Sequence, residues 1–173
     1  MAESDPVSTR SRRMSELGDK AQKRTWRQTE KRSTTQLDDR FYDQVIIGSD
    51  LSKHKQKVSD SIIPDHLAVF DSNGVPLNIE ELDDFRSVSH FEIVEDKNYQ
   101  IEIEQGRNNL ISKTLKQIHE RNSLLSSLGA SVHQTIRIDM SGHGKISLNE
   151  MESFYKRLIE VIPDNVDIEI LLK

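Results

Sequence analysis

Large apolar residues are rare in the first 40 positions of the chain. Met14, Leu17, Trp26 and Leu37 stand nearly alone among Ser, Thr, Gln, Lys and Arg. So little apolar surface cannot offset the entropy lost when such a segment becomes ordered. The pattern predicts a disordered or extended N-terminal arm. Residues 48–60 read as a linker, so we expect arm and linker over 1–58 and a folded domain over 59–173.

From residue 62 onward, short apolar runs alternate with turn residues, which is typical of strands. The pattern predicts a first hairpin over 66–79, because an Asn-Gly pair at 73–74 favours a tight turn. A second hairpin is predicted over 90–105, where Tyr99, Ile101 and Ile103 alternate with polar residues. A third hairpin is predicted over 135–148, and a closing strand over 166–172.

Two segments have helical spacing of their apolar residues. The first runs from about 108 to 127 and ends before Gly129. Its apolar stripe fits ordinary core packing or, alternatively, a dimer seam with Asn122 inside it. The second helix is predicted over 150–162 and is strongly amphipathic. Together these elements predict an α+β fold: a two-layer sandwich of a mostly antiparallel sheet with two main helices.

Charge divides the chain in the same place as hydrophobicity. The formal net charge is −5, which is the sum of +4 over residues 1–58 and −9 over residues 59–173. The basic charge is densest in residues 10–32, which we call the basic segment and which contain nine Lys or Arg and three Asp or Glu. A basic tail on an acidic domain is typical of an interaction segment.

Composition excludes several classes of protein. The chain has no Cys, so it has no disulfide, thiol nucleophile or Cys-ligated metal site. No apolar run is long enough to span a membrane, and the N-terminus has no signal-peptide pattern, so we expect a cytoplasmic protein. The six His are scattered, and adjacent acidic pairs such as Glu95 and Asp96 are expected to be solvated. No catalytic motif is present, so we expect a protein that is not an enzyme.

One segment has the spacing of a known ion site. Asp139, Ser141, Gly144, Ser147 and Glu150 occupy positions one, three, six, nine and twelve of the segment 139–150. This resembles the calcium loop of the EF-hand family, which surrounds a hard cation with oxygens and turns at a glycine. The resemblance implies calcium as a possible cofactor, with ligands from Asp139, Ser141, Ser147 and Glu150. The alternative that we prefer from the residues alone is a plain β-hairpin.

The basic segment contains the other candidate binding residues, which combine cationic side chains with one Trp: Arg12, Arg13, Lys23, Arg24, Trp26, Arg27, Lys31 and Arg32. Such a segment can order on a protein partner, or it can bind phosphates while its indole stacks on a base. We therefore expect a non-enzymatic interaction or assembly protein that does not bind membranes, with a homo-oligomer as one form of that assembly. The alternatives are a calcium-binding module and a nucleic-acid-contacting protein.

Overall fold

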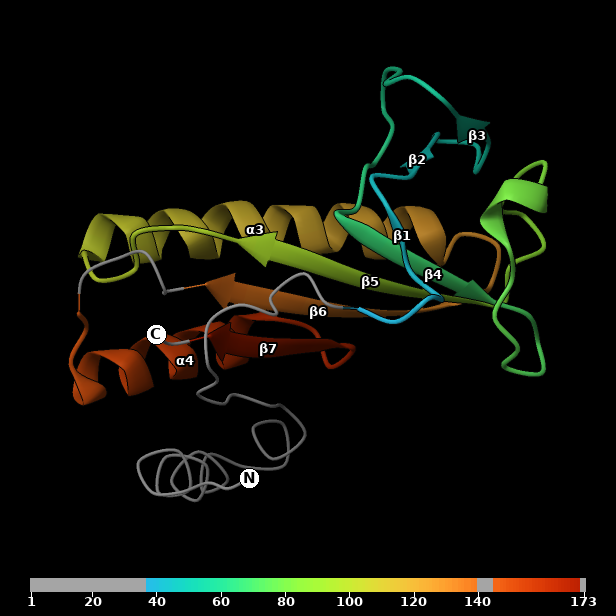
Figure 1. Ribbon diagram of the computed structural model, residues 1–173. Coiled ribbons are helices and arrows are strands. Elements are labelled where there is room, and N and C mark those ends of the chain that lie inside the picture. Colours follow the sequence, from blue (N-terminus) through green and yellow to red (C-terminus); the bar gives the residue numbers. More distant parts are fainter. Residues whose placement is uncertain (1–36, 140–144, 172–173) are drawn as a thin grey trace. The chain divides into compact units, whose positions relative to one another are not determined.

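The computed structural model describes residues 37–139 and 145–171 (Figure 1). The predicted N-terminal arm up to residue 36 and the middle of the predicted calcium loop lie outside these ranges. The described elements are, in chain order, the strands β1 (Tyr42–Asp43), β2 (Ile46–Ile47), β3 (Lys53–His54) and β4 (His66–Phe70), the short helix η1 (Ile79–Glu81), β5 (His90–Lys97), α3 (Glu104–Leu125), β6 (Ser131–Asp139), α4 (Leu148–Val161) and β7 (Val166–Leu171).

The strands form a five-stranded sheet in the order β1-β4-β5-β6-β7 and a two-stranded sheet of β2 and β3. β4 pairs antiparallel with both β1 and β5. β5 and β6 instead run in the same direction. Glu92 of β5 contacts His133 of β6, and Asp96, further along β5, contacts Arg137, which lies equally further along β6. The predicted α+β class with two main helices is confirmed, and the sheet is mixed. Parallel neighbours need a long crossover connection, and α3 provides it between β5 and β6.

The chain divides into two compact units. The β4 unit consists of the described residues 37–95 together with Gln117–Gln134, and the β7 unit consists of Asp96–Lys116 and the described residues from Thr135 onward. β5, α3 and β6 each contribute residues to both units.

The β4 unit has a core of aliphatic and aromatic side chains from β4, β5 and the end of α3, including Leu67, Phe91 and Leu125. The predicted turn after β4 is confirmed: Gly74 has φ 78°, and its N–H donates to the Asp71 carbonyl at 3.0 Å. The returning chain makes only an isolated bridge at Pro76, since proline cannot donate to a strand ladder.

The same core extends into residues before position 59, where the folded domain is expected to begin. Ile47 and Leu51 are buried, and their segment forms the β2–β3 sheet. Leu51 adopts φ 66°, which closes the tight turn between these two strands. The fold of the β4 unit therefore includes part of 37–58, before the expected start of the folded domain at residue 59.

The predicted hairpin over 90–105 is wrong. β5 ends at Lys97, and α3 begins at Glu104. Ile101, in the turn that joins them, is fully buried, and a Cβ added to Gly106 would lie only 2.0 Å from the Gln100 carbonyl oxygen. Only glycine permits this approach, so the apparent alternation of Tyr99, Ile101 and Ile103 belongs to a helix-entry turn rather than to a strand.

The predicted hairpin over 135–148 is also wrong in its second half. β6 is a strand, but Leu148 is the first residue of α4. Ser147 is the N-cap of that helix and forms a capping box with Glu150, which favours helix over strand. The helix predicted over 150–162 and the strand predicted from 166 are confirmed. In the β7 unit, α4 buries Met151, Phe154, Tyr155, Leu158 and Ile159, and β7 buries Val166, Ile168 and Ile170.

Candidate functional site

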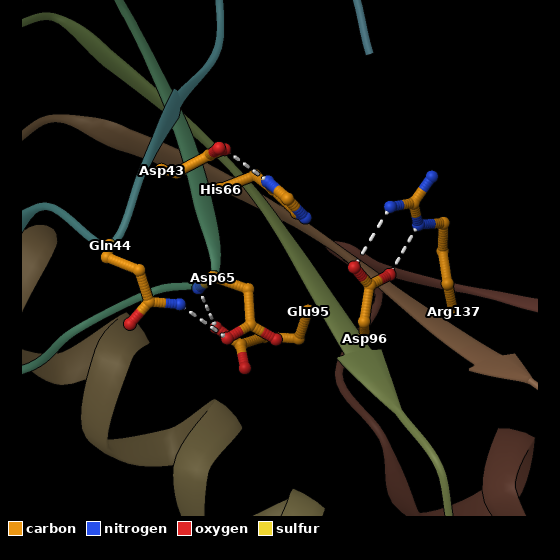
Figure 2. A network of polar contacts seen from close by, with 7 residues as sticks. All are labelled: Asp43, Gln44, Asp65, His66, Glu95, Asp96 and Arg137. Carbon is orange, nitrogen blue, oxygen red and sulfur yellow. Dashed lines mark hydrogen bonds and ion pairs between the residues drawn. The ribbon is translucent and has the colours of Figure 1, made fainter. Parts of the chain in front are cut away.

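Two histidines lie on one face of the sheet in the β4 unit. His66 and His90 share this face with Glu92. In the β4–β5 pairing, His66 lies opposite Val94, and Val94, Glu92 and His90 are alternate residues of β5. His66 Nδ1 contacts Asp43 Oδ1 at 2.7 Å (Figure 2). The opposite face carries the core residues Leu67 and Phe91. The scattered histidines of the sequence are thus partly gathered by strand pairing.

His90 forms the centre of a polar chain. Its Nδ1 lies 2.6 Å from Ser131 Oγ, and its Nε2 lies 3.1 Å from Glu92 Oε1. Glu92 also contacts His133 through its other oxygen. The order serine, histidine, carboxylate is that of a nucleophile, a base and an orienting group. Here the Ser131 hydroxyl also contacts the Ser89 carbonyl at 3.4 Å. Ser131, His90, Glu92 and His133 form a continuous chain of contacts that joins β5 to β6. Such cross-strand pairs stabilise a sheet.

A buried ion pair lies on the other face of β5 in the β4 unit. Glu95 and Arg121 are only 3% and 5% exposed, and Arg121 NH1 lies 2.6 Å from Glu95 Oε2. Glu95 Oε2 also accepts the backbone N–H of Asp65 at 2.7 Å, and Arg121 NH2 donates to the Ile63 carbonyl at 3.4 Å. These contacts tie β5, α3 and the chain before β4 together. The prediction that Glu95 is a solvated charge is therefore wrong.

Arg137 in the β7 unit binds the next carboxylate of the same strand. Its Nε and NH2 donate to the two oxygens of Asp96 at 2.7 and 3.1 Å, which is bidentate pairing (Figure 2). The Arg137 side chain is buried, but that of Asp96 is 30% exposed. Asp96 was also predicted to be simply solvated, which is wrong. Like Arg121, Arg137 is a buried cation that is paired within the folded part.

Exposed carboxylates near the start of the described chain have lowered pKa values. Hydrogen bonds from the Arg40 side chain and backbone hold the pKa of Asp38 below its usual range. Hydrogen bonds from the Ser52 hydroxyl and backbone do the same to the pKa of Asp50. Reciprocally, the hydrogen bond with Asp38 raises the pKa of Arg40, whose guanidinium lies 5.6 Å from the centre of the Phe70 ring.

Three of the four predicted calcium ligands lie in the described residues. Asp139 ends β6 and is half-buried, and Ser147 and Glu150 lie at the start of α4. The Ser147 hydroxyl accepts the Glu150 N–H at 3.1 Å, and Glu150 Oε1 lies 3.4 Å from the Ser147 N–H, so both serve as a helix cap. Ser141 lies outside the described residues. Across 37–139 and 145–171, no group of three or more His, Asp or Glu side chains is placed to hold a metal. Calcium binding stays a prediction.

The candidate residues of the basic segment lie outside the part of the chain that the structure describes: Arg12, Arg13, Lys23, Arg24, Trp26, Arg27, Lys31 and Arg32. Their role is therefore inferred from sequence and charge alone. No helix among the described residues is long and apolar enough to cross a membrane.

β7 closes the five-stranded order and presents acidic side chains. It follows β6 in the sheet and is the last strand of the order (Figure 1). Asp167 and Glu169 alternate along it with Val166, Ile168 and Ile170, which are fully buried. The acidic side chains are half-buried on the opposite face. An edge strand with this pattern was visible in the sequence as alternation, but its edge position was not.

Comparison with known proteins gives no relative: no family model, no curated protein and no solved structure matches the chain.

Proposed function

We propose that the protein is a non-enzymatic assembly protein, in which the basic arm of one copy binds the acidic folded part of another. The observation that supports this proposal is how the folded part uses its cations. Arg121 and Arg137 are buried against carboxylates, and the Arg107 side chain is largely buried, with NH1 donating to the Ile101 carbonyl at 2.8 Å.

The charge of Lys53 is also engaged within the fold. Its ammonium group donates to the carbonyls of Ile79 and Leu82 at 2.8 and 2.9 Å. Residues 37–58, which include Lys53, add no net charge, and residues 59–173 carry −9; cations engaged inside the fold are less available to screen the carboxylates. The chain therefore joins an acidic surface to a basic segment, and opposite charges of this kind steer association between molecules.

Neutralising the arm in the full-length chain tests this function. Replacing Arg12, Arg13, Lys23, Arg24, Arg27, Lys31 and Arg32 by Gln is preferable to deleting residues 1–50, which would remove the buried Ile47. We expect the wild type to self-associate in sedimentation velocity and to dissociate as NaCl rises from about 0.05 to 0.5 M, because salt screens the charges. The neutralised chain should remain monomeric at both salt concentrations.

Two outcomes would overturn the proposal. A neutralised chain that associates as strongly as the wild type would show that the arm is not needed. A wild type that stays monomeric but binds single-stranded RNA or DNA, with an affinity that falls with salt and with neutralisation, would replace assembly by nucleic-acid contact.

A further inference from the structure

The Ser131 hydroxyl is held beside an imidazole at one end of the sheet in the β4 unit. The Ser131 N–H donates to the Ser89 carbonyl at 3.0 Å, which fixes the first residue of β6 against the start of β5. The His90 ring lies 5.6 Å from the Phe70 ring, centroid to centroid, in a tilted arrangement. Backbone pairing and ring packing therefore position both the hydroxyl and the imidazole, as a reactive pair requires.

Hydrogen-bond accounting assigns the proton of the neutral His90 ring. A carboxylate only accepts hydrogen bonds, so His90 Nε2, which lies 3.1 Å from Glu92 Oε1, carries the ring proton. His90 Nδ1 then has a lone pair and accepts the Ser131 hydroxyl at 2.6 Å. The Ser89 carbonyl also lies near that hydroxyl, but at 3.4 Å it is farther than in an ordinary O–H···O hydrogen bond. The hydroxyl proton therefore points to His90.

Glu92 is held from a second direction as well. Its other carboxylate oxygen contacts His133 Nδ1, which comes from the neighbouring strand β6. The side chains of Glu92 and His90 are 24% and 32% exposed, so their hydrogen bond is partly shielded from water. A carboxylate fixed in this way keeps the imidazole in one tautomer and stabilises the imidazolium that forms when His90 takes a proton.

Ser131 is accessible to a reagent from solvent. The residue is exposed, and it follows directly on the turn between α3 and β6. In that turn Leu128 is 61% exposed, and a Cβ added at Gly129 would be in open space. The Glu92 carboxylate repels anions, so an uncharged acyl carbonyl suits this site better than a phosphoryl group. Leu128, three residues before Ser131, offers an apolar side chain beside which a small acyl group can lie.

We propose that Ser131 is an acyl-acceptor site, at which His90 acts as the general base. Ser131 Oγ attacks the carbonyl carbon of an activated ester or thioester, and His90 Nδ1 takes the hydroxyl proton. A C–O bond forms between Oγ and the acyl group, and the bond to the leaving group breaks. The proton passes from His90 to the departing alkoxide or thiolate. The product is an O-acyl serine, so the reaction modifies the chain and goes beyond the assembly proposed above without depending on it.

Acetylation of the full-length chain by p-nitrophenyl acetate tests the site. The matched internal control is Ser123, an exposed serine of α3 in the same unit. Mass spectrometry of peptides from the digested protein gives the acetylation rate of each serine. Ser131 should react about a hundredfold faster than Ser123, or more, which is what a positioned general base contributes. In concentrated urea the ratio of the two rates should fall to about one, because unfolding separates Ser131 from His90.

Two variants separate the roles of the base and of the carboxylate. His90→Phe keeps a ring against Phe70 and removes the base, so the rate at Ser131 should fall to that at Ser123. Glu92→Gln leaves the imidazole in place, but an amide donates as well as accepts and no longer fixes the proton on Nε2. The rate at Ser131 should then fall by about tenfold or more. The rate at Ser123 should stay the same in both variants.

The wild type alone can overturn the proposal. Equal acetylation rates at Ser131 and Ser123 in the folded chain, or a high ratio that persists in urea, would show that the fold does not activate Ser131. A rate at Ser131 that His90→Phe leaves unchanged would remove His90 as the base and overturn the proposal in the same way. Self-association is not a readout of this experiment, so either proposal can fail while the other stands.

Discussion

Glu95 and Asp96 are neighbours in the chain, and each forms an ion pair, but one pair is buried and the other is partly exposed. Both are carboxylates of β5, and each is paired with an arginine, Arg121 and Arg137 respectively. Glu95 is 3% exposed and faces α3 in the β4 unit, whereas the Asp96 side chain is 30% exposed and pairs with β6 in the β7 unit. Successive residues of a strand point to opposite faces, so one step along the chain exchanges a buried charge for a half-exposed one.

Burial, rather than the presence of an ion pair, sets the energetic consequence of losing a partner. A charge left alone in a dry environment keeps its full desolvation penalty, whereas water can replace a partner at a half-exposed site. Substitutions at these two pairs, and at a third arginine–carboxylate pair on the surface, should therefore differ in their effect on stability.

Glu95→Gln should have the largest effect on stability. The side chain keeps its size and an oxygen that can accept the Asp65 N–H, so the change removes the charge facing Arg121. An unpaired buried guanidinium is expected to lower the free energy of unfolding by about 3–5 kcal/mol. Urea unfolding followed by circular dichroism measures it. A loss below about 1 kcal/mol would show that Arg121 is solvated in solution.

Replacing both members should be less harmful than replacing one. In Glu95→Leu with Arg121→Met, no charge remains buried, and hydrophobic replacements of ion pairs are often neutral. The Asp65 N–H loses its acceptor, so we expect a net loss of about 1–2 kcal/mol in the same unfolding experiment. A double variant that is as unstable as the sum of two single variants would mean that the two side chains do not interact.

Asp96→Asn should cost less than Glu95→Gln. The substitution weakens a bidentate pair to Arg137, but the site is partly open to water. We expect a loss of about 1–2 kcal/mol in the free energy of unfolding. Equal losses for Asp96→Asn and Glu95→Gln, measured side by side, would remove the distinction between the two faces of β5.

Local patterns in the sequence were enough to predict several elements. The Asn-Gly turn after β4 and the apolar spacing of α4 are signals carried within a few residues. The class of the fold followed from counting such elements. The hairpin after β5 failed because the alternation of Tyr99 to Ile103 is a local signal too, and the tight contact between Gly106 and the Gln100 carbonyl outweighs it.

The candidate sites were harder to predict because they depend on long-range pairing. Ser131 and His90 are brought together by parallel pairing of β5 and β6, which requires knowing that α3 lies between them. Arg121 lies among the helical positions that face the core, and only the position of Glu95 explains an arginine there. The sequence predicted a closing strand over 166–172, but its position at the end of the strand order depends on the pairing of the whole sheet.

The smallest expected effect on stability is at the exposed pair of Asp38 and Arg40. Arg40 donates to both oxygens of Asp38, from Nε at 2.9 Å and from NH2 at 2.7 Å, and these contacts lower the pKa of Asp38. A carboxyl with a lowered pKa favours the folded state above its unfolded pKa, and this contribution disappears as pH falls through the folded value. We expect Arg40→Gln to raise the pKa of Asp38 toward its ordinary value in an NMR titration, while the urea midpoint at pH 7 barely changes, because water solvates both groups. A midpoint that falls as far as that of Glu95→Gln would mean that burial does not grade these pairs.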